Sequence, residues 1–110
     1  MIKGSHQRQN REEAFHSSPD RGRELMLDVQ LNDTRHSAFA YSFLVSIDAE
    51  LPGLIVLKFT SAEVRIEGGG LKSLYELFLS QRVQLIREWD HSTSENEVNI
   101  RRIQVIPLTT

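Results

Sequence analysis

The sequence predicts a small α+β domain, and three observations carry this prediction. Apolar side chains alternate along three segments between residues 24 and 67, which is the period of half-buried strands, and a fourth segment is apolar on both faces. A helical period follows the three glycines at 68–70, and a second β-type region closes the chain. At 110 residues the chain has room for one domain.

The first 23 residues differ sharply in composition from the rest. They contain few apolar side chains, and such a segment cannot bury enough surface to offset the entropy lost on ordering. We therefore expect a disordered tail at 1–23 and a single domain at 24–110. The tail carries a net charge of +2 and the domain a net charge of −4. An acidic domain is a poor partner for nucleic acid, because phosphate neutralisation dominates such binding.

Four strands are expected, at about 24–31, 38–48, 54–60 and 62–67, and short turns join them into an antiparallel meander. Segment 54–59 is apolar on both faces, which is typical of a central strand covered by a second layer.

The segment 38–48 has the strictest alternation in the chain. One of its faces carries five apolar side chains: Phe39, Tyr41, Phe43, Val45 and Ile47. We expect this face in the core, where Tyr41 would need a hydrogen-bond partner. Replacing Phe43 by Ala should then cost about 3–5 kcal/mol.

A helix is expected at 71–80. Leu71, Leu74, Tyr75 and Phe78 recur at helical spacing, and further leucines leave only a narrow polar stripe. The helix should pack on one face of the sheet, and its other side would need additional cover.

The C-terminal region is predicted to be a β-hairpin over 82–106. Residues 82–89 fit either a continued helix or a strand, and the β-type run that follows at 98–106 favours the strand. In this last run the apolar side chains change face at Arg101-Arg102, which indicates a β-bulge.

Catalytic and metal-binding signatures are not found in the sequence. The chain has no cysteine, and its four histidines lack the spacing of a metal site. No segment has the length of a membrane span. We expect neither an enzyme nor a cofactor, and the lack of cysteine and of an apolar leader favours a cytoplasmic location.

One group of neighbouring residues has the features of an anion-binding site. Gly68, Gly69 and Gly70 precede the helix, and Lys72 and Ser73 begin it. Glycines allow close approach of a ligand to the backbone, and a helix N-terminus attracts anions, so these five residues form a candidate phosphate or anion site. The alternative is a plain chain reversal, because the spacings of nucleotide-binding loops are missing.

A second candidate is a basic patch made of Arg82, Arg87, Arg101 and Arg102, which the predicted hairpin would gather on one surface. The alternative is ion pairing across the hairpin with nearby glutamates.

Two functions follow from these patterns. The preferred one is a non-enzymatic interaction or assembly domain that self-associates, as a homodimer, or that binds another protein, because the helix is apolar nearly all round. The alternative is an anion-binding module at Gly68–Gly70. The sequence leaves the ligand, the partner and the strand order open.

Overall fold

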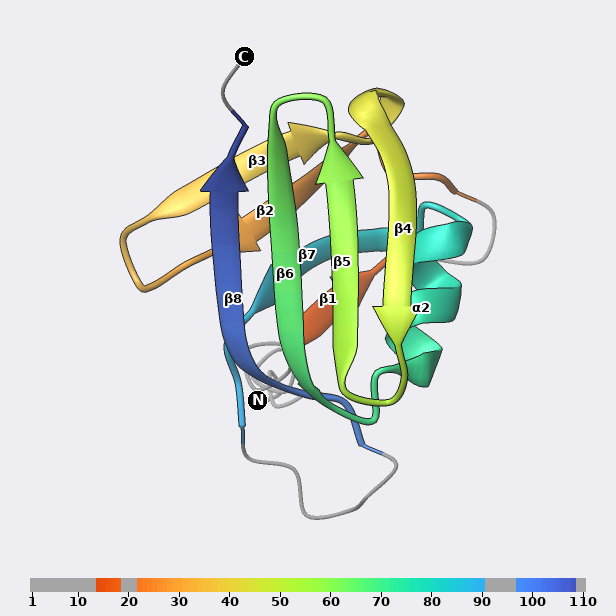
Figure 1. The fold of residues 1–110 in the computed structure, drawn as a ribbon, viewed down its shortest axis with the longest axis vertical. Coiled ribbons are helices and arrows are strands. Elements are labelled where there is room, and N and C mark those ends of the chain that lie inside the picture. Colours follow the sequence, from red (N-terminus) through yellow and green to blue (C-terminus); the bar gives the residue numbers. More distant parts are fainter. Residues whose placement is uncertain (1–13, 19–21, 91–96, 109–110) are drawn as a thin grey trace, which may run out of the picture.

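The chain folds into two facing four-stranded sheets with one helix at their side (Figure 1). The computed structural model describes residues 14–18, 22–90 and 97–108. Its elements, in chain order, are β1 (Phe15–Ser17), β2 (Met26–Gln30), β3 (His36–Ala40), the 3-10 helix η1 (Tyr41–Phe43), β4 (Leu44–Glu50), β5 (Leu54–Phe59), β6 (Ala62–Gly69), α2 (Lys72–Leu79), β7 (Val83–Arg87) and β8 (Asn99–Pro107). Strands dominate over the single helix, so the broad α+β class is confirmed.

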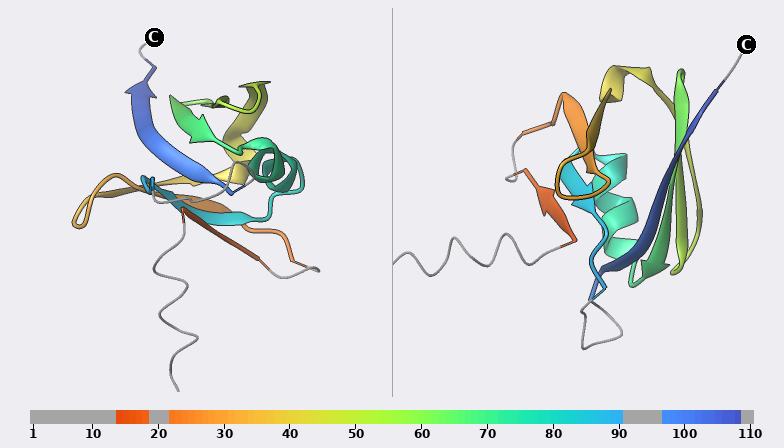
Figure 2. Two further views of the ribbon diagram at one scale, coloured as in Figure 1. Left: turned by 90° about the horizontal axis from the view of Figure 1, so that it is seen from below. Right: turned by 90° about the vertical axis from the view of Figure 1, so that its left-hand side faces the viewer.

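The two sheets have different strand orders. Sheet I runs β1-β7-β2-β3, and sheet II runs β4-β5-β6-β8. Figure 2 shows them as separate layers, with α2 in the gap between them at one side. Strand β5 lies between β4 and β6, as predicted for a central strand. The meander is confirmed for β4, β5 and β6, whereas β2 and β3 form a hairpin in the opposite sheet.

The predicted strand at 38–48 is in fact two strands in different sheets. The η1 turn separates β3 from β4 and carries the chain from sheet I to sheet II. This turn changes which side chains face the core: Tyr41 is 4% exposed, but Phe43 is 58% and Val45 68% exposed. The predicted burial of Phe43 and Val45 is therefore wrong, because alternation continues through both halves and does not reveal the turn.

The region 82–106 does not form the predicted hairpin. Residues 83–87 are a strand, as favoured, but β7 joins sheet I, parallel to β2 and antiparallel to β1. Strand β8 joins sheet II beside β6, and an isolated β-bridge between Trp89 and Ile100 connects it to the end of the β7 region. Both strands have an apolar face, and placing them in opposite sheets buries both faces in one core. The bulge at Arg101 is confirmed, since the register passes from Glu67↔Arg102 to Gly68↔Ile100.

Part of the expected tail belongs to sheet I. Ala14 is 2% exposed and Ser18 is 5% exposed. The Ser18 N–H donates to the Arg82 carbonyl (2.7 Å), and the Arg87 N–H donates to the Ala14 carbonyl (2.9 Å). Backbone hydrogen bonds thus hold this segment in sheet I, although its polar composition does not predict a strand. The domain boundary expected at residue 24 omits β1. Residues 1–13 and 19–21 lie outside the described residues.

The core fills the space between the sheets and α2. Leu74 and Phe78 of the helix, and Leu71 just before it, are at most 1% exposed, and they pack in one cluster with apolar side chains of both sheets. The helix is covered on two sides by two sheets, so its wide apolar surface is satisfied within the chain. Leu79, at its end, is 59% exposed. In the described part of the chain no helix has the length and apolar character to cross a membrane.

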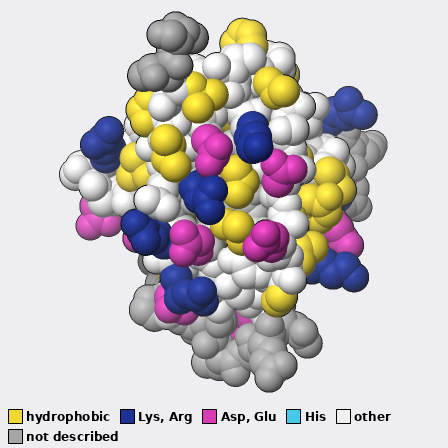
Figure 3. Space-filling model, in the orientation of Figure 1, with side chains coloured by type: hydrophobic (Ala, Val, Ile, Leu, Met, Phe, Trp, Pro, Cys, Tyr) yellow, Lys and Arg dark blue, Asp and Glu magenta, His cyan; other side chains and the backbone are white. Residues whose placement is uncertain are grey.

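The outer face of sheet II is charged in both signs, and acidic and basic side chains alternate across it in Figure 3. Lys58 Nζ lies 3.1 Å from a carboxylate oxygen of Asp48, and Arg65 Nη1 lies 3.2 Å from one of Glu63. Such an alternating surface is typical of a solvated sheet face.

Candidate interaction edge

Strand β3 is an outer strand of sheet I, and among the described strands it pairs with β2 alone. The Leu31 N–H donates to the Arg35 carbonyl (2.8 Å), and the Tyr41 N–H donates to the Leu25 carbonyl (3.0 Å). These two bonds flank the ladder, so the odd-numbered residues of β3 bond to β2. By alternation, the backbone N–H and C=O groups of the even residues, 36, 38 and 40, point away from the sheet.

The side chains of this edge are small and carry little charge. Ala38 is exposed and Ala40 is half-buried, and His36 is the only titratable residue on the strand. Natural edge strands are commonly protected by lysine, proline or a bulge. Strand β3 has neither lysine nor proline, and its register with β2 is unbroken. Sequence reasoning missed this edge, although the uncharged run from Ser37 to Ala40 was a usable signal.

Contacts at the turn end of the β2–β3 hairpin hold the edge in an extended shape. In the turn, the Asn32 Oδ1 atom accepts the backbone N–H groups of Thr34 and Arg35, both at 2.9 Å. On the strand, His36 Nδ1 lies 3.0 Å from Asp28 Oδ1, and this pair joins β3 to β2. A strand that is already ordered loses less entropy when a partner binds.

Aromatic side chains fix the other end of β3 to the core. Phe39 stacks on Phe59 of sheet II, with ring centroids 4.9 Å apart and planes inclined by 24°. Tyr41 donates its hydroxyl hydrogen to the Val83 carbonyl (2.7 Å), so it has a hydrogen-bond partner in the core, as the sequence required. Burial raises the pKa of Tyr41 well above its usual value, and the negative charge of Glu24 acts in the same direction.

The outer strand β8 of sheet II is protected. A carboxylate oxygen of Glu88 accepts the Ile103 N–H (2.9 Å), and Trp89 and Ile100 exchange two backbone bonds of 2.7 and 2.8 Å. The strand ends at Pro107, which has no N–H to offer.

The remaining two edges are less suited to strand pairing than β3. Strand β1 is three residues long. Strand β4 has a bulge at the exposed Val45 and lies on the side of the molecule that carries α2 (Figure 1). Bulges interrupt the regular ladder that an added strand requires.

The glycine-rich segment serves the geometry of the chain. Gly68 and Gly69 belong to β6, and a Cβ atom on Gly68 would overlap the backbone carbonyl of Asn99 in β8. Gly70 has a φ of 63°, which a side chain would disfavour.

The donors near the start of α2 are partly occupied. The Gly68 N–H bonds to the Gly53 carbonyl (3.0 Å), and the Leu71 N–H bonds to the Pro52 carbonyl (3.1 Å). Lys72 and Ser73 are exposed on the first turn of the helix. These two N–H groups therefore bond to carbonyl oxygens of the chain and are not available to an anion.

The four arginines divide between the sheets. Arg82 precedes β7, where its Nη2 donates to the Ser18 carbonyl (3.2 Å), and Arg87 ends that strand. Arg101 and Arg102 are exposed on β8. The hairpin that would have gathered them is absent from the described fold.

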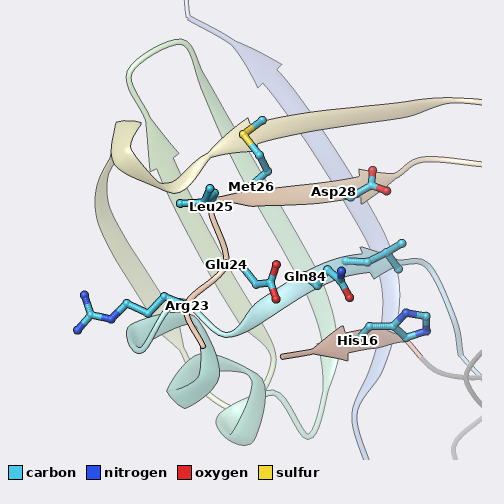
Figure 4. Close-up of a pocket in the computed structure, with 8 residues that line it drawn as sticks. His16, Arg23, Glu24, Leu25, Met26, Asp28 and Gln84 are labelled. Atoms are coloured by element: carbon cyan, nitrogen blue, oxygen red, sulfur yellow. The ribbon is translucent and has the colours of Figure 1, made fainter. Parts of the chain in front are cut away.

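A groove of about 680 Å3 lies on the outer face of sheet I (Figure 4). Its lining comes from three strands and the segment before β2, and includes His16, Glu24, Met26, Asp28, Gln84 and Leu85. Figure 4 shows Glu24 and Gln84 near its centre and the Arg23 side chain directed away from them. The groove mixes apolar and polar groups and charges of both signs. Within the described ranges, no cluster of three or more His, Asp or Glu side chains could hold a metal ion.

No family model, curated protein or solved structure matches this chain.

Proposed function

We propose that this chain is a non-enzymatic interaction domain that binds an extended protein segment along the open edge of β3. In this mode the ligand adds a strand to the sheet, so main-chain hydrogen bonds supply affinity and neighbouring side chains supply specificity. The observation that carries the proposal is the row of outward backbone groups at His36, Ala38 and Ala40, which meet no partner among the described residues.

The contrast with β8 supports this choice of edge. At β8, side-chain and backbone groups from the end of β7 cover outward donors. At β3, small side chains leave the edge accessible, and part of the β2–β3 hairpin projects beyond the rest of the body (Figure 1). An edge that is bare and regular is the form that strand addition requires.

The surface that favours association differs from the one expected from the sequence. The apolar surface of α2 is largely buried by the chain itself, so it gives little reason for a partner. The anion-binding alternative at Gly68–Gly70 has gained no supporting contact, because neighbouring carbonyls occupy two of the nearby donors. The β3 edge is the stronger basis for an interaction function.

A selection of random heptapeptides against the full chain tests the proposal. Peptides that bind should shift the amide resonances of Ala38 and Ala40 in a titration followed by NMR. The Ala38→Pro variant should lose at least about tenfold in peptide affinity, because proline removes the central outward N–H, at an edge position where proline is tolerated. Ala38→Ser keeps the N–H and a small side chain and should bind as the parent does. Peptides that bind elsewhere, or that bind Ala38→Pro equally well, would refute strand addition at β3.

A further inference from the structure

We propose, building on the interaction function above, that the segment added to β3 is β3 of a second copy, antiparallel to the first about a two-fold axis at Ala38. The two copies of sheet I would then form one continuous eight-stranded sheet. Two-fold pairing through one shared surface is the commonest arrangement of homo-oligomers.

The hydrogen-bond register favours this axis. With Ala38 opposite Ala38 of the second copy, His36 lies opposite Ala40 and Ala40 opposite His36. All three are residues whose backbone groups point outward. In an antiparallel ladder such opposed residues exchange both of their bonds, so each outward N–H in either copy meets a carbonyl. An axis at Ser37 or Phe39 would also oppose outward-pointing residues, but it would pair only two of the three within β3, whereas the axis at Ala38 pairs all three.

The side chains are complementary in size at this register. Directly opposed residues in an antiparallel pair have Cβ atoms about 5 Å apart. At the axis alanine meets alanine, and on either side the larger His36 meets the small Ala40. No bulky pair has to be accommodated along the seam.

The charges near the seam are balanced, so two copies can meet there without like-charge repulsion. Near the seam, the Asp28 carboxylate is already paired with His36 (3.0 Å). Beyond the seam, antiparallel pairing brings Arg35 of one hairpin opposite Tyr41 of the other copy. Glu24 lies near that tyrosine, since the neighbouring Leu25 carbonyl accepts the Tyr41 N–H. The turn that reaches the other copy carries an exposed Asp33 and an exposed Arg35, so it brings no excess of one charge to the seam.

Apolar surface beside β3 adds to the area that the pairing would bury. A stable interface covers about 800 Å2 on each partner, which is more than a five-residue edge supplies. Leu25 is 82% exposed, Met26 46% and Phe43 58%, and all three lie near the end of β3 that the second hairpin would reach. Their partial burial would support a dimer with a dissociation constant in the micromolar range.

Sedimentation of the full chain between about 1 and 200 μM tests the dimer. We expect a monomer–dimer equilibrium that Ala38→Ser retains and that Ala38→Pro weakens at least about tenfold, because the variant loses the bonds at the axis. Ala38→Lys provides a second variant that needs no change in the backbone. It places two like charges across the axis, so its dimer should weaken at low salt and recover partly at high salt.

Cross-linking tests the register. The chain has no cysteine, so a single introduced thiol reports one position. Directly opposed residues that exchange hydrogen bonds have Cα atoms about 5.5 Å apart, within the range that a disulfide spans. Under mild oxidation Ala38→Cys should form a covalent dimer at least about tenfold faster than Ser61→Cys, an exposed site in the turn between β5 and β6. Equal rates would refute the axis at Ala38.

The outcomes separate this inference from the function on which it rests. A monomer at 200 μM that still binds selected peptides at Ala38 would overturn the second copy as partner and leave strand addition standing. A monomer that binds no peptide at β3 would overturn both. A dimer that Ala38→Pro and Ala38→Lys leave unchanged would show that the copies associate through another surface.

Discussion

Strands β3 and β8 both lie at the outside of a sheet, yet their outward backbone groups have different surroundings. Along β8, Glu88 and Trp89 from the end of β7 bond to Ile103 and Ile100. Along β3, the hairpin turn and the aromatic contacts hold the strand but leave its outer side bare among the described residues. The outward backbone groups of an edge strand are thus covered by residues from elsewhere in the chain. The sequence of the strand itself therefore does not predict whether its edge is open.

The largest expected effect concerns the anchor of β3. Phe59→Ala should lower the free energy of unfolding by about 3–5 kcal/mol, because it removes a side chain that is 2% exposed. It also removes the ring on which Phe39 stacks, so amide hydrogen exchange in β3 should accelerate more than in β8. The matched variant Phe43→Ala should cost less than about 1 kcal/mol, since that ring is 58% exposed. Equal losses in urea unfolding would contradict the burial that separates these two rings.

The pairing of β8 should depend on one glycine. In Gly68→Ala, the added Cβ overlaps a backbone carbonyl of β8, which cannot move without breaking the ladder, so we expect a loss of about 2–3 kcal/mol. In Gly69→Ala the nearest atom is the side-chain Nδ2 of Asn99 at 3.2 Å, which can shift, so the loss should stay below about 1 kcal/mol. Urea unfolding measures both variants, and similar stabilities would disprove the close approach at Gly68.

Removing the carboxylate that covers β8 should make the two edges more alike. Glu88→Ala deprives the Ile103 N–H of its acceptor and should cost about 1 kcal/mol, with faster hydrogen exchange at that amide. Glu88→Gln keeps a side-chain oxygen and should lie between the parent and the alanine variant. If the exchange rate of Ile103 is the same in all three proteins, the carboxylate does not protect this edge.

The smallest expected effect is at Tyr41, and its size depends on pH. Tyr41→Phe should cost about 1 kcal/mol at pH 7, because the Val83 carbonyl loses a hydrogen bond. Burial raises the pKa of Tyr41 in the folded chain, whereas in the unfolded chain a tyrosine ionises near pH 10. The contribution of Tyr41 to stability is therefore full below about pH 10 and is lost as the pH rises further.

Unfolding from pH 7 to 11 measures this difference. The gap in stability between the parent and Tyr41→Phe should narrow above about pH 10, while Tyr75 is common to both proteins and cancels. A constant gap over this range would contradict the raised pKa.

Period and composition were sufficient for several elements. The apolar character of both faces at 54–59 predicted β5 and its central place, the helical spacing at 71–80 predicted α2, and the phase change at Arg101 predicted the bulge in β8. These features depend on neighbours within a few residues of one another. Local sequence therefore contains the information that specifies them.

Other features were decided by contacts between distant segments. The division of 38–48 at Tyr41 depends on the Val83 carbonyl, and the strand at Phe15–Ser17 depends on bonds to β7. The candidate edge has the same origin, because β3 becomes an outer strand only when β7 takes the other side of β2.

The sequence alone determined that this protein combines strands with one helix. It also determined which face of most strands turns toward the core, and that the helix needs cover. Only the tertiary structure decided which sheet each strand joins, which apolar side chains stay exposed and which edge remains open. The physical reason is that periodicity specifies the face of a strand toward the core, whereas its lateral neighbours are set by how all the apolar faces are buried together.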